Sequence, residues 1–79
     1  MIDEMEYLER FAYLLNVTMK EERMTAADLA RDSKLSKAAV SRYLNAKRMP
    51  SLKAVVNMSI ALNRDLYDIV PVTTSLIVE

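Results

Sequence analysis

The sequence has no cysteine, no histidine, no glycine and no tryptophan among its 79 residues. Without cysteine the chain has neither a disulfide framework nor a thiolate metal site. Without histidine it lacks the most common general base and metal ligand, and no glycine loop for phosphate or pair of nucleophile and base is visible. We therefore expect no catalytic residue, no metal site, no cofactor and no small-molecule ligand, and the protein is predicted not to be an enzyme.

Backbone breakers are also scarce, because Pro50 and Pro71 are the only prolines. A glycine-free chain rich in alanine, leucine, methionine, lysine and glutamate favours helix, and its length suits one small domain. The acidic N-terminus does not resemble a secretory signal, and no apolar stretch approaches the ~20 residues of a membrane span. We expect an all-α cytoplasmic protein with no membrane partner.

The net charge of zero hides a strong segregation of charge along the chain. Residues 31–53 carry seven basic residues and one acid, whereas residues 1–30 and 54–79 are both net acidic. An anionic partner responds to the local distribution, because distant acids are screened over a Debye length of ~8 Å at physiological salt. A basic cluster can also be a solvated helix face, so the cluster alone does not identify the partner.

Periodicity and capping residues predict five helices. The first spans about residues 3–22, with apolar residues at three- and four-residue spacing from Met5 to Met19. A capping box at Thr25 and Asp28 starts a second helix that ends near Ser33. The third spans 37–45, the fourth 52–63, and a short turn follows before Pro71; the expected N-caps of these three are Ser36, Ser51 and Asp65.

The expected inward faces follow from the same spacing. In the second helix they are Leu29, Ala30 and Ser33, and in the third Val40, Tyr43 and Leu44. The fourth helix is apolar over much of its surface, including Leu52 and Ile60, and is therefore predicted to be largely buried. Asn63 at its end is expected to adopt a left-handed conformation.

The last segment differs in composition from the rest. Val72, Thr73, Thr74, Ile77 and Val78 are β-branched, and no helical period is visible. We read residues 71–79 as a strand-forming tail attached to a helical domain of residues 1–70. A single strand has no partner in its own chain, so it either pairs with its copy in a second subunit or frays.

The stretch "TAADLARDSKLSKAAVSRYLNAKRMPSLKAVVNMSIALNRDLYDIV" resembles the lambda-repressor-like helix-turn-helix domains, the Cro/CI or XRE class of phage and bacterial regulators. The resemblance covers about residues 12–70 without insertion. It implies a compact five-helix DNA-binding domain in which residues 37–45 form the recognition helix. The matching positions are Leu29, Ala30, Ser36, Val40, Ser41, Arg42, Tyr43, Asn45, Lys47, Arg48 and Pro50.

The chain departs from the family pattern at four positions. Arg23, Lys34 and Ala46 stand where family members often have glycine, and Met19 stands where arginine is frequent. A non-glycine residue in a left-handed conformation costs roughly 1 kcal/mol. These substitutions are expected to affect the local shape and stability of the three loops and to leave the helical register unchanged.

A helix in the major groove must expose hydrogen-bond donors near its N-terminal half. The predicted base-reading residues are Lys37, Ala38, Ser41 and Arg42, with Arg42 and Lys37 as the principal readers. Each charge has the alternative of a phosphate contact or of simple solvation. Phosphate contacts are expected from the starts of the second and third helices and from the loop after the third: Thr25, Ala26, Ser36, Asn45, Lys47 and Arg48.

We therefore predict a sequence-specific transcriptional regulator, a phage repressor or Cro-like protein, that binds an inverted-repeat operator in double-stranded DNA as a homodimer. The tail is the candidate dimerisation element, through Val72, Leu76, Ile77 and Val78. One alternative is a protein-interaction module that keeps the fold but no longer binds DNA. A second is an antitoxin that binds both its promoter and a toxin.

Overall fold

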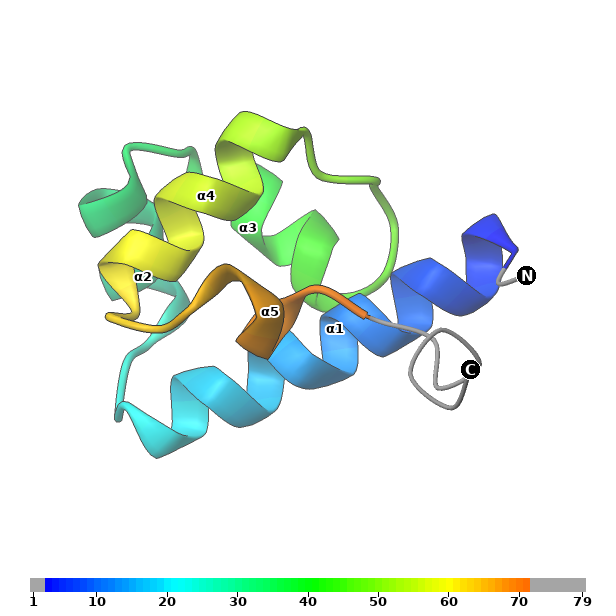
Figure 1. The fold of residues 1–79 in the computed structure, drawn as a ribbon. Coiled ribbons are helices and arrows are strands. Elements are labelled where there is room, and N and C mark those ends of the chain that lie inside the picture. The colour runs from blue at the N-terminus through cyan, green and yellow to red at the C-terminus, as the bar shows by residue number, and fades with distance from the viewer. Residues whose placement is uncertain (1–2, 72–79) are drawn as a thin grey trace.

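The computed structural model describes residues 3–71, which form five helices (Figure 1). No strand occurs within these described residues, so the predicted all-α class and the helix order are confirmed. Helix boundaries agree with the prediction to within two residues. The helices are α1 (Glu4–Glu21), α2 (Ala26–Ser33), α3 (Lys37–Leu44), α4 (Leu52–Ala61) and α5 (Leu66–Ile69).

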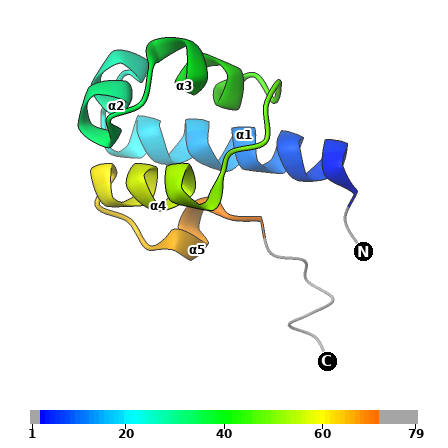
Figure 2. The same ribbon diagram turned by 90° about the horizontal axis from the view of Figure 1, so that it is seen from above.

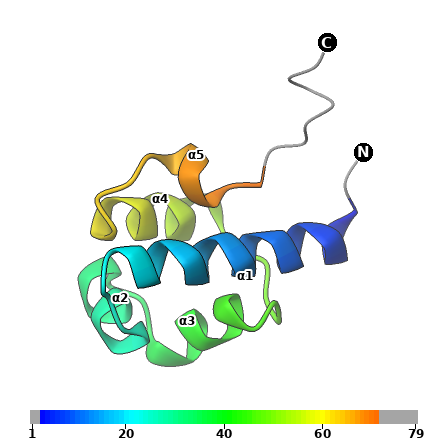
Figure 3. The same ribbon diagram turned by 90° about the horizontal axis from the view of Figure 1, so that it is seen from below.

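The helices pack in a closed ring in which each contacts two others. The order around the ring is α1, α3, α2, α4, α5 and back to α1. Figures 2 and 3 show α1 running the length of the molecule, with α2 and α3 on one side and α4 and α5 on the other. Because α3 contacts only α1 and α2, one of its long faces is left to solvent.

Every helix contributes at least one fully buried side chain to the core. The largest are Phe11, Leu15, Leu29, Val40, Met58, Leu62 and Ile69. The ring of Tyr43 on α3 meets Phe11 on α1 edge to face, with centroids 6.4 Å apart. Tyr43 is 4% exposed, which confirms its assignment to the core and shows how α3 is held against α1.

The predicted capping residues start the helices as expected. Thr25 and Asp28 form a complete capping box at α2, with both reciprocal hydrogen bonds present, and Asp65 and Asp68 do the same at α5. The hydroxyl oxygens of Ser36 and Ser51 accept hydrogen bonds from the backbone N–H groups three residues later. These local bonds satisfy N–H groups that the helices themselves leave unpaired.

The four longer helices all end on a left-handed residue that is not glycine. The φ angles are 55° at Arg23, 60° at Lys34, 57° at Ala46 and 55° at Asn63. In each case the N–H of the following residue bonds a carbonyl five residues back, as in the Schellman motif. The left-handed conformation typical of glycine is therefore kept, at a cost of roughly 1 kcal/mol for a residue such as Ala46.

Met5 on α1 is 61% exposed, because the N-terminal end of α1 extends beyond the helices that pack on it (Figure 2). The expectation that α4 is largely buried is confirmed only in part: Val55 and Met58 are buried, whereas Leu52 is 73% and Ile60 71% exposed. Only α2 and α5 pack against α4, so its remaining face has no helix to cover it. The predicted tail strand, residues 72–79, lies outside the described residues.

Candidate nucleic-acid interface

Helix α3 presents a continuous polar face to solvent. Its buried side consists of Ala39, Val40 and Tyr43, which face the core. The four residues predicted to read bases all lie on the other side and are exposed, together with the C-cap Asn45. The exposed set is Lys37, Ala38, Ser41, Arg42 and Asn45.

The surface around α3 carries a group of cations that make no ion pair within the described residues. No acidic residue occurs in the sequence between Asp32 and Asp65. Among residues 3–71, ion pairs within 4.0 Å occupy Arg10, Arg31 and Arg64. None involves the cations on or near α3, which leaves their charge available to an anionic ligand: Lys34, Lys37, Arg42, Lys47, Arg48 and Lys53.

Helix starts divide into two classes by their charge. Helices α1, α2 and α5 have acidic residues in their first turn, whereas α3 and α4 have none. The caps of the two acid-free helices, Ser36 and Ser51, line one shared hollow of about 470 Å³ together with Lys34, Arg48 and Lys53. Two uncompensated positive helix ends and three cations therefore face the same space, an arrangement that attracts anions.

A family model described as helix-turn-helix matches residues 18–69, which is more than half of the chain. The chain belongs to the Cro/CI-like helix-turn-helix family. The two helices of the motif are α2 and α3, joined through Lys34, Leu35 and Ser36. No curated protein and no solved structure matches the chain significantly. The match points to a DNA-binding transcriptional regulator as the broad functional class.

The start of α2 is a weaker anion site in this helix-turn-helix protein than the start of α3. The Asp28 carboxylate accepts a hydrogen bond from the backbone N–H of Thr25. This hydrogen bond lowers the pKa of the Asp28 carboxyl, and the Thr25 side chain and the charge of Arg31 lower it further. An ionised acid therefore sits at the positive end of α2. Thr25 is exposed and Ala26 half-buried, so both remain at the surface, but beside a negative charge.

Asn45 has its side-chain amide turned back onto α3. Its Nδ2 donates to the Ser41 carbonyl oxygen at 2.7 Å. Lys47 and Arg48 in the following loop are exposed and make no ion pair among the described residues. The loop cations are thus better placed to reach an anion than the Asn45 amide.

Ser51 belongs to this surface, although its sequence context predicts only a helix cap. The lack of an acid in the first turn of α4 is the sequence feature that indicates an anion-attracting helix start. What the sequence does not reveal is that Ser51 and Ser36, 15 residues apart in the chain, line the same hollow. The predicted dimerisation residues, Val72, Leu76, Ile77 and Val78, lie outside the described residues.

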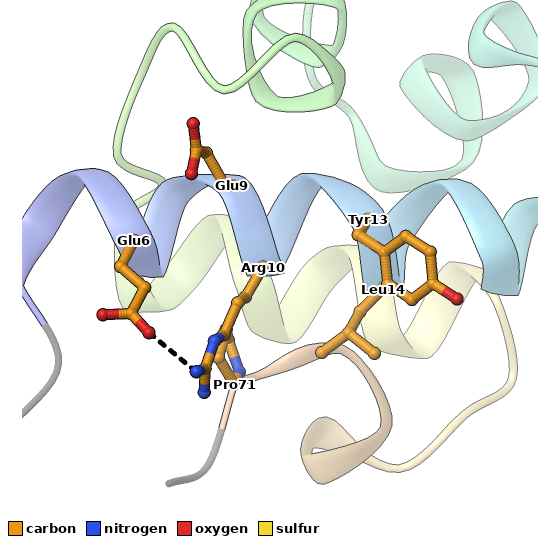
Figure 4. Close-up of a pocket in the computed structure, with 6 residues that line it drawn as sticks. All are labelled: Glu6, Glu9, Arg10, Tyr13, Leu14 and Pro71. Carbon is orange, nitrogen blue, oxygen red and sulfur yellow. Dashed lines mark hydrogen bonds and ion pairs between the residues drawn. The ribbon is translucent and has the colours of Figure 1, made fainter.

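A second hollow lies beside α1, away from α3 (Figure 4). It measures about 420 Å³ and is lined by Glu6, Glu9, Arg10, Tyr13, Leu14 and Pro71. Glu6 pairs with Arg10 at 2.7 Å, and Glu9 makes no ion pair with any other residue that the structure describes. The apolar and acidic lining does not suit a nucleic-acid backbone. Tyr13, 67% exposed, offers a ring for contact with another protein.

Within residues 3–71 no cluster of acidic side chains is arranged to hold a metal ion. None of the described helices has the length and apolar character needed to cross a membrane.

Proposed function

We propose that the protein is a sequence-specific transcriptional regulator of the phage-repressor or Cro-like type. It lays α3 in the major groove of an inverted-repeat operator, where base edges are contacted by Lys37, Ala38, Ser41 and Arg42. The observation that carries this proposal is the group of six cations on and near α3 that make no ion pair within residues 3–71, three of which line the hollow at the acid-free starts of α3 and α4.

Phosphate contacts flank this reading helix in the proposed complex. The strongest come from Lys47 and Arg48, which make no ion pair within residues 3–71, and from the Ser36 hydroxyl, whose oxygen already caps α3 and which can also donate. Weaker contacts come from the start of α2 and from the end of α3. This second group consists of Thr25, Ala26 and Asn45.

The bound form is proposed to be a homodimer, because one short helix reads too few base pairs for selectivity. Two α3 helices about one DNA turn apart, ~34 Å, would match an inverted repeat. The tail supplies the interface in this proposal through Val72, Leu76, Ile77 and Val78. Its β-branched sequence suits antiparallel pairing with a second copy.

Retention on random duplex DNA at low salt tests the proposal. The double variant Arg42→Ala, Arg48→Ala removes two of the six cations on and near α3 and is expected to abolish most retention. The control Lys20→Ala, Arg23→Ala removes the same charge from exposed positions at the end of α1 and is expected to elute like the unmodified protein. Equal retention of both double variants would contradict DNA binding through α3.

The two alternatives, an interaction module that no longer binds DNA and an antitoxin that also holds a toxin, share one observation in their favour. The hollow beside α1 is lined by the exposed Tyr13 and the half-buried Leu14, and its lining carries no positive surplus (Figure 4). A protein that is not retained on duplex DNA but loses binding to a protein partner in Tyr13→Ser would be an interaction module. A protein that is retained on DNA through α3 and loses only the partner in Tyr13→Ser would match the antitoxin.

We also propose that the protein carries out no catalysis. This rests on the absence of cysteine and histidine from the sequence and on the lack of a metal-holding cluster within the described residues.

A further inference from the structure

We infer that α3 reads guanines, and that its reading face has no side chain available for bidentate pairing with adenine. This inference rests on the proposed function, because it assigns a base preference to the same helix. The reading face is the exposed set on α3: Lys37, Ala38, Ser41, Arg42 and Asn45.

The donor and acceptor pattern of these side chains limits which bases they can distinguish. In the major groove guanine presents two acceptors, O6 and N7, whereas adenine presents the N7 acceptor beside an N6 donor. Lys37 and Arg42 only donate, so both match guanine and neither matches adenine in a bidentate pair. Ala38 offers a methyl group, which suits the thymine methyl. Ser41 can donate or accept and therefore does not discriminate.

Asn45 is the one amide on the reading face, and amides are the usual readers of adenine. Its Nδ2 is engaged 2.7 Å from the Ser41 carbonyl oxygen, and the same nitrogen lies 3.5 Å from the Ser41 hydroxyl. Both contacts of the amide nitrogen are thus made to Ser41, on the preceding turn of the same helix. Asn45 is also the C-cap of α3, and we assign its amide to the helix end and not to a base.

The spacing of the two donors indicates that they read different base pairs. Lys37 and Arg42 are five residues apart, which is about 7.5 Å along a helix and about 140° around it. Base pairs rise ~3.4 Å along the duplex, which is less than the separation of the two donors along α3, so Lys37 and Arg42 are expected to reach different base pairs. The side chains of Ser41, Asn45 and Ala38 lie between them around the exposed face. Each half-site is therefore expected to contain two G·C pairs at different positions.

Selection of bound duplexes from a random pool, with the full chain, tests this inference. The expected motif has G·C pairs at two positions in each half-site. In selected duplexes, 7-deazaguanine at either position removes the N7 acceptor but keeps O6, and is expected to weaken binding by part of the roughly 5- to 150-fold that a whole bidentate pair contributes. The loss of affinity caused by 7-deazaguanine should disappear in Arg42→Ala at the guanine that Arg42 contacts. In Lys37→Ala it should disappear at the guanine that Lys37 contacts.

Substitution by an amide gives an independent readout. Arg42→Gln and Lys37→Gln each introduce an adenine reader and are expected to change the selected base from guanine to adenine at one position only. Lys20→Gln, on α1, is the matched control and should select the unmodified motif. Circular dichroism establishes that each variant keeps its helices, and the 7-deazaguanine measurement requires no variant if one fails to fold.

The possible failures are distinguishable. A motif of A·T pairs alone, or tight binding that is insensitive to 7-deazaguanine, overturns the guanine assignment while DNA binding stands. Unchanged selection by both glutamine variants overturns it as well. Absence of binding to any duplex defeats the proposed function, and the base preference falls with it.

Discussion

The side-chain amide of Asn16 on α1 bonds the backbone carbonyl of Leu44 at the end of α3, with an Nδ2–O distance of 3.3 Å. The same nitrogen donates to the Ala12 carbonyl at 2.8 Å. The long first helix therefore fixes the C-terminal end of α3 by a polar contact, in addition to the packing of Phe11 on Tyr43. Helix α3 is held from its buried side, and its exposed side stays free.

Asn16→Ala should lower the free energy of unfolding by about 0.5–1.5 kcal/mol, because it removes the contact that joins α1 to α3. Urea denaturation measures the change. Glu9→Ala, an exposed substitution on the same helix, is the control and should stay within about 0.5 kcal/mol of the unmodified protein. An Asn16→Ala protein as stable as the control would show that the contact contributes nothing.

Ala46→Gly should stabilise the protein by up to about 1 kcal/mol. The residue has φ 57°, which glycine adopts without the steric cost that alanine meets. Ala27→Gly, at an exposed helical position in α2, is the matched control and should destabilise by about 0.5–1 kcal/mol. Thermal melts of the two variants are thus predicted to shift in opposite directions, and shifts of the same sign would contradict the strain at Ala46.

The Asp28 cap should make stability depend on acid pH. Its pKa is lowered in the folded protein, chiefly by the hydrogen bond from the Thr25 backbone N–H. A carboxyl with a depressed folded pKa stabilises above its unfolded pKa of about 3.9, and this contribution is lost as pH falls through the folded value. The stability gap between the unmodified protein and Asp28→Asn should therefore shrink below about pH 4. Urea titrations from neutral pH to below the folded pKa measure this difference in the free energy of unfolding. A difference that stays constant would show that the Asp28 carboxylate does not stabilise the folded protein.

Lys47→Ala and Arg48→Ala should weaken binding to all duplexes by similar factors. Each is proposed to contact a phosphate, so each should reduce the slope of log affinity against log salt by about one. Fluorescence anisotropy over a range of salt concentrations measures this slope. Lys20→Ala should leave it unchanged, and a variant that alters only sequence preference would place that residue at a base edge instead.

Deletion of residues 72–79 should weaken self-association and operator binding while leaving helical content nearly intact. The five helices and their core lie within residues 3–71, so the tail is not needed for the ring of contacts. Sedimentation velocity and circular dichroism measure the two properties separately. An unchanged sedimentation profile would remove the tail from the dimer interface and direct attention to the exposed Leu52 and Ile60 on α4.

Features determined by the sequence alone are those built within a few residues. The capping boxes at Thr25 and Asp65 and the serine caps of α3 and α4 depend on hydrogen bonds that span three residues. The exposed face of α3 follows similarly from its 3.6-residue period. The left-handed helix ends were readable at Asn63 and, through the family resemblance, at Arg23, Lys34 and Ala46.

Tertiary structure decided which apolar surfaces are covered and which distant groups meet. Nothing local distinguishes Leu52 and Ile60 from the buried Val55 and Met58, because their exposure depends on where α2 and α5 pack. The contact between Asn16 and Leu44 and the shared hollow of Ser36 and Ser51 likewise join groups far apart in the chain. Local periodicity specifies each helix and its polar side, but only the packing of all five brings the acid-free helix starts together.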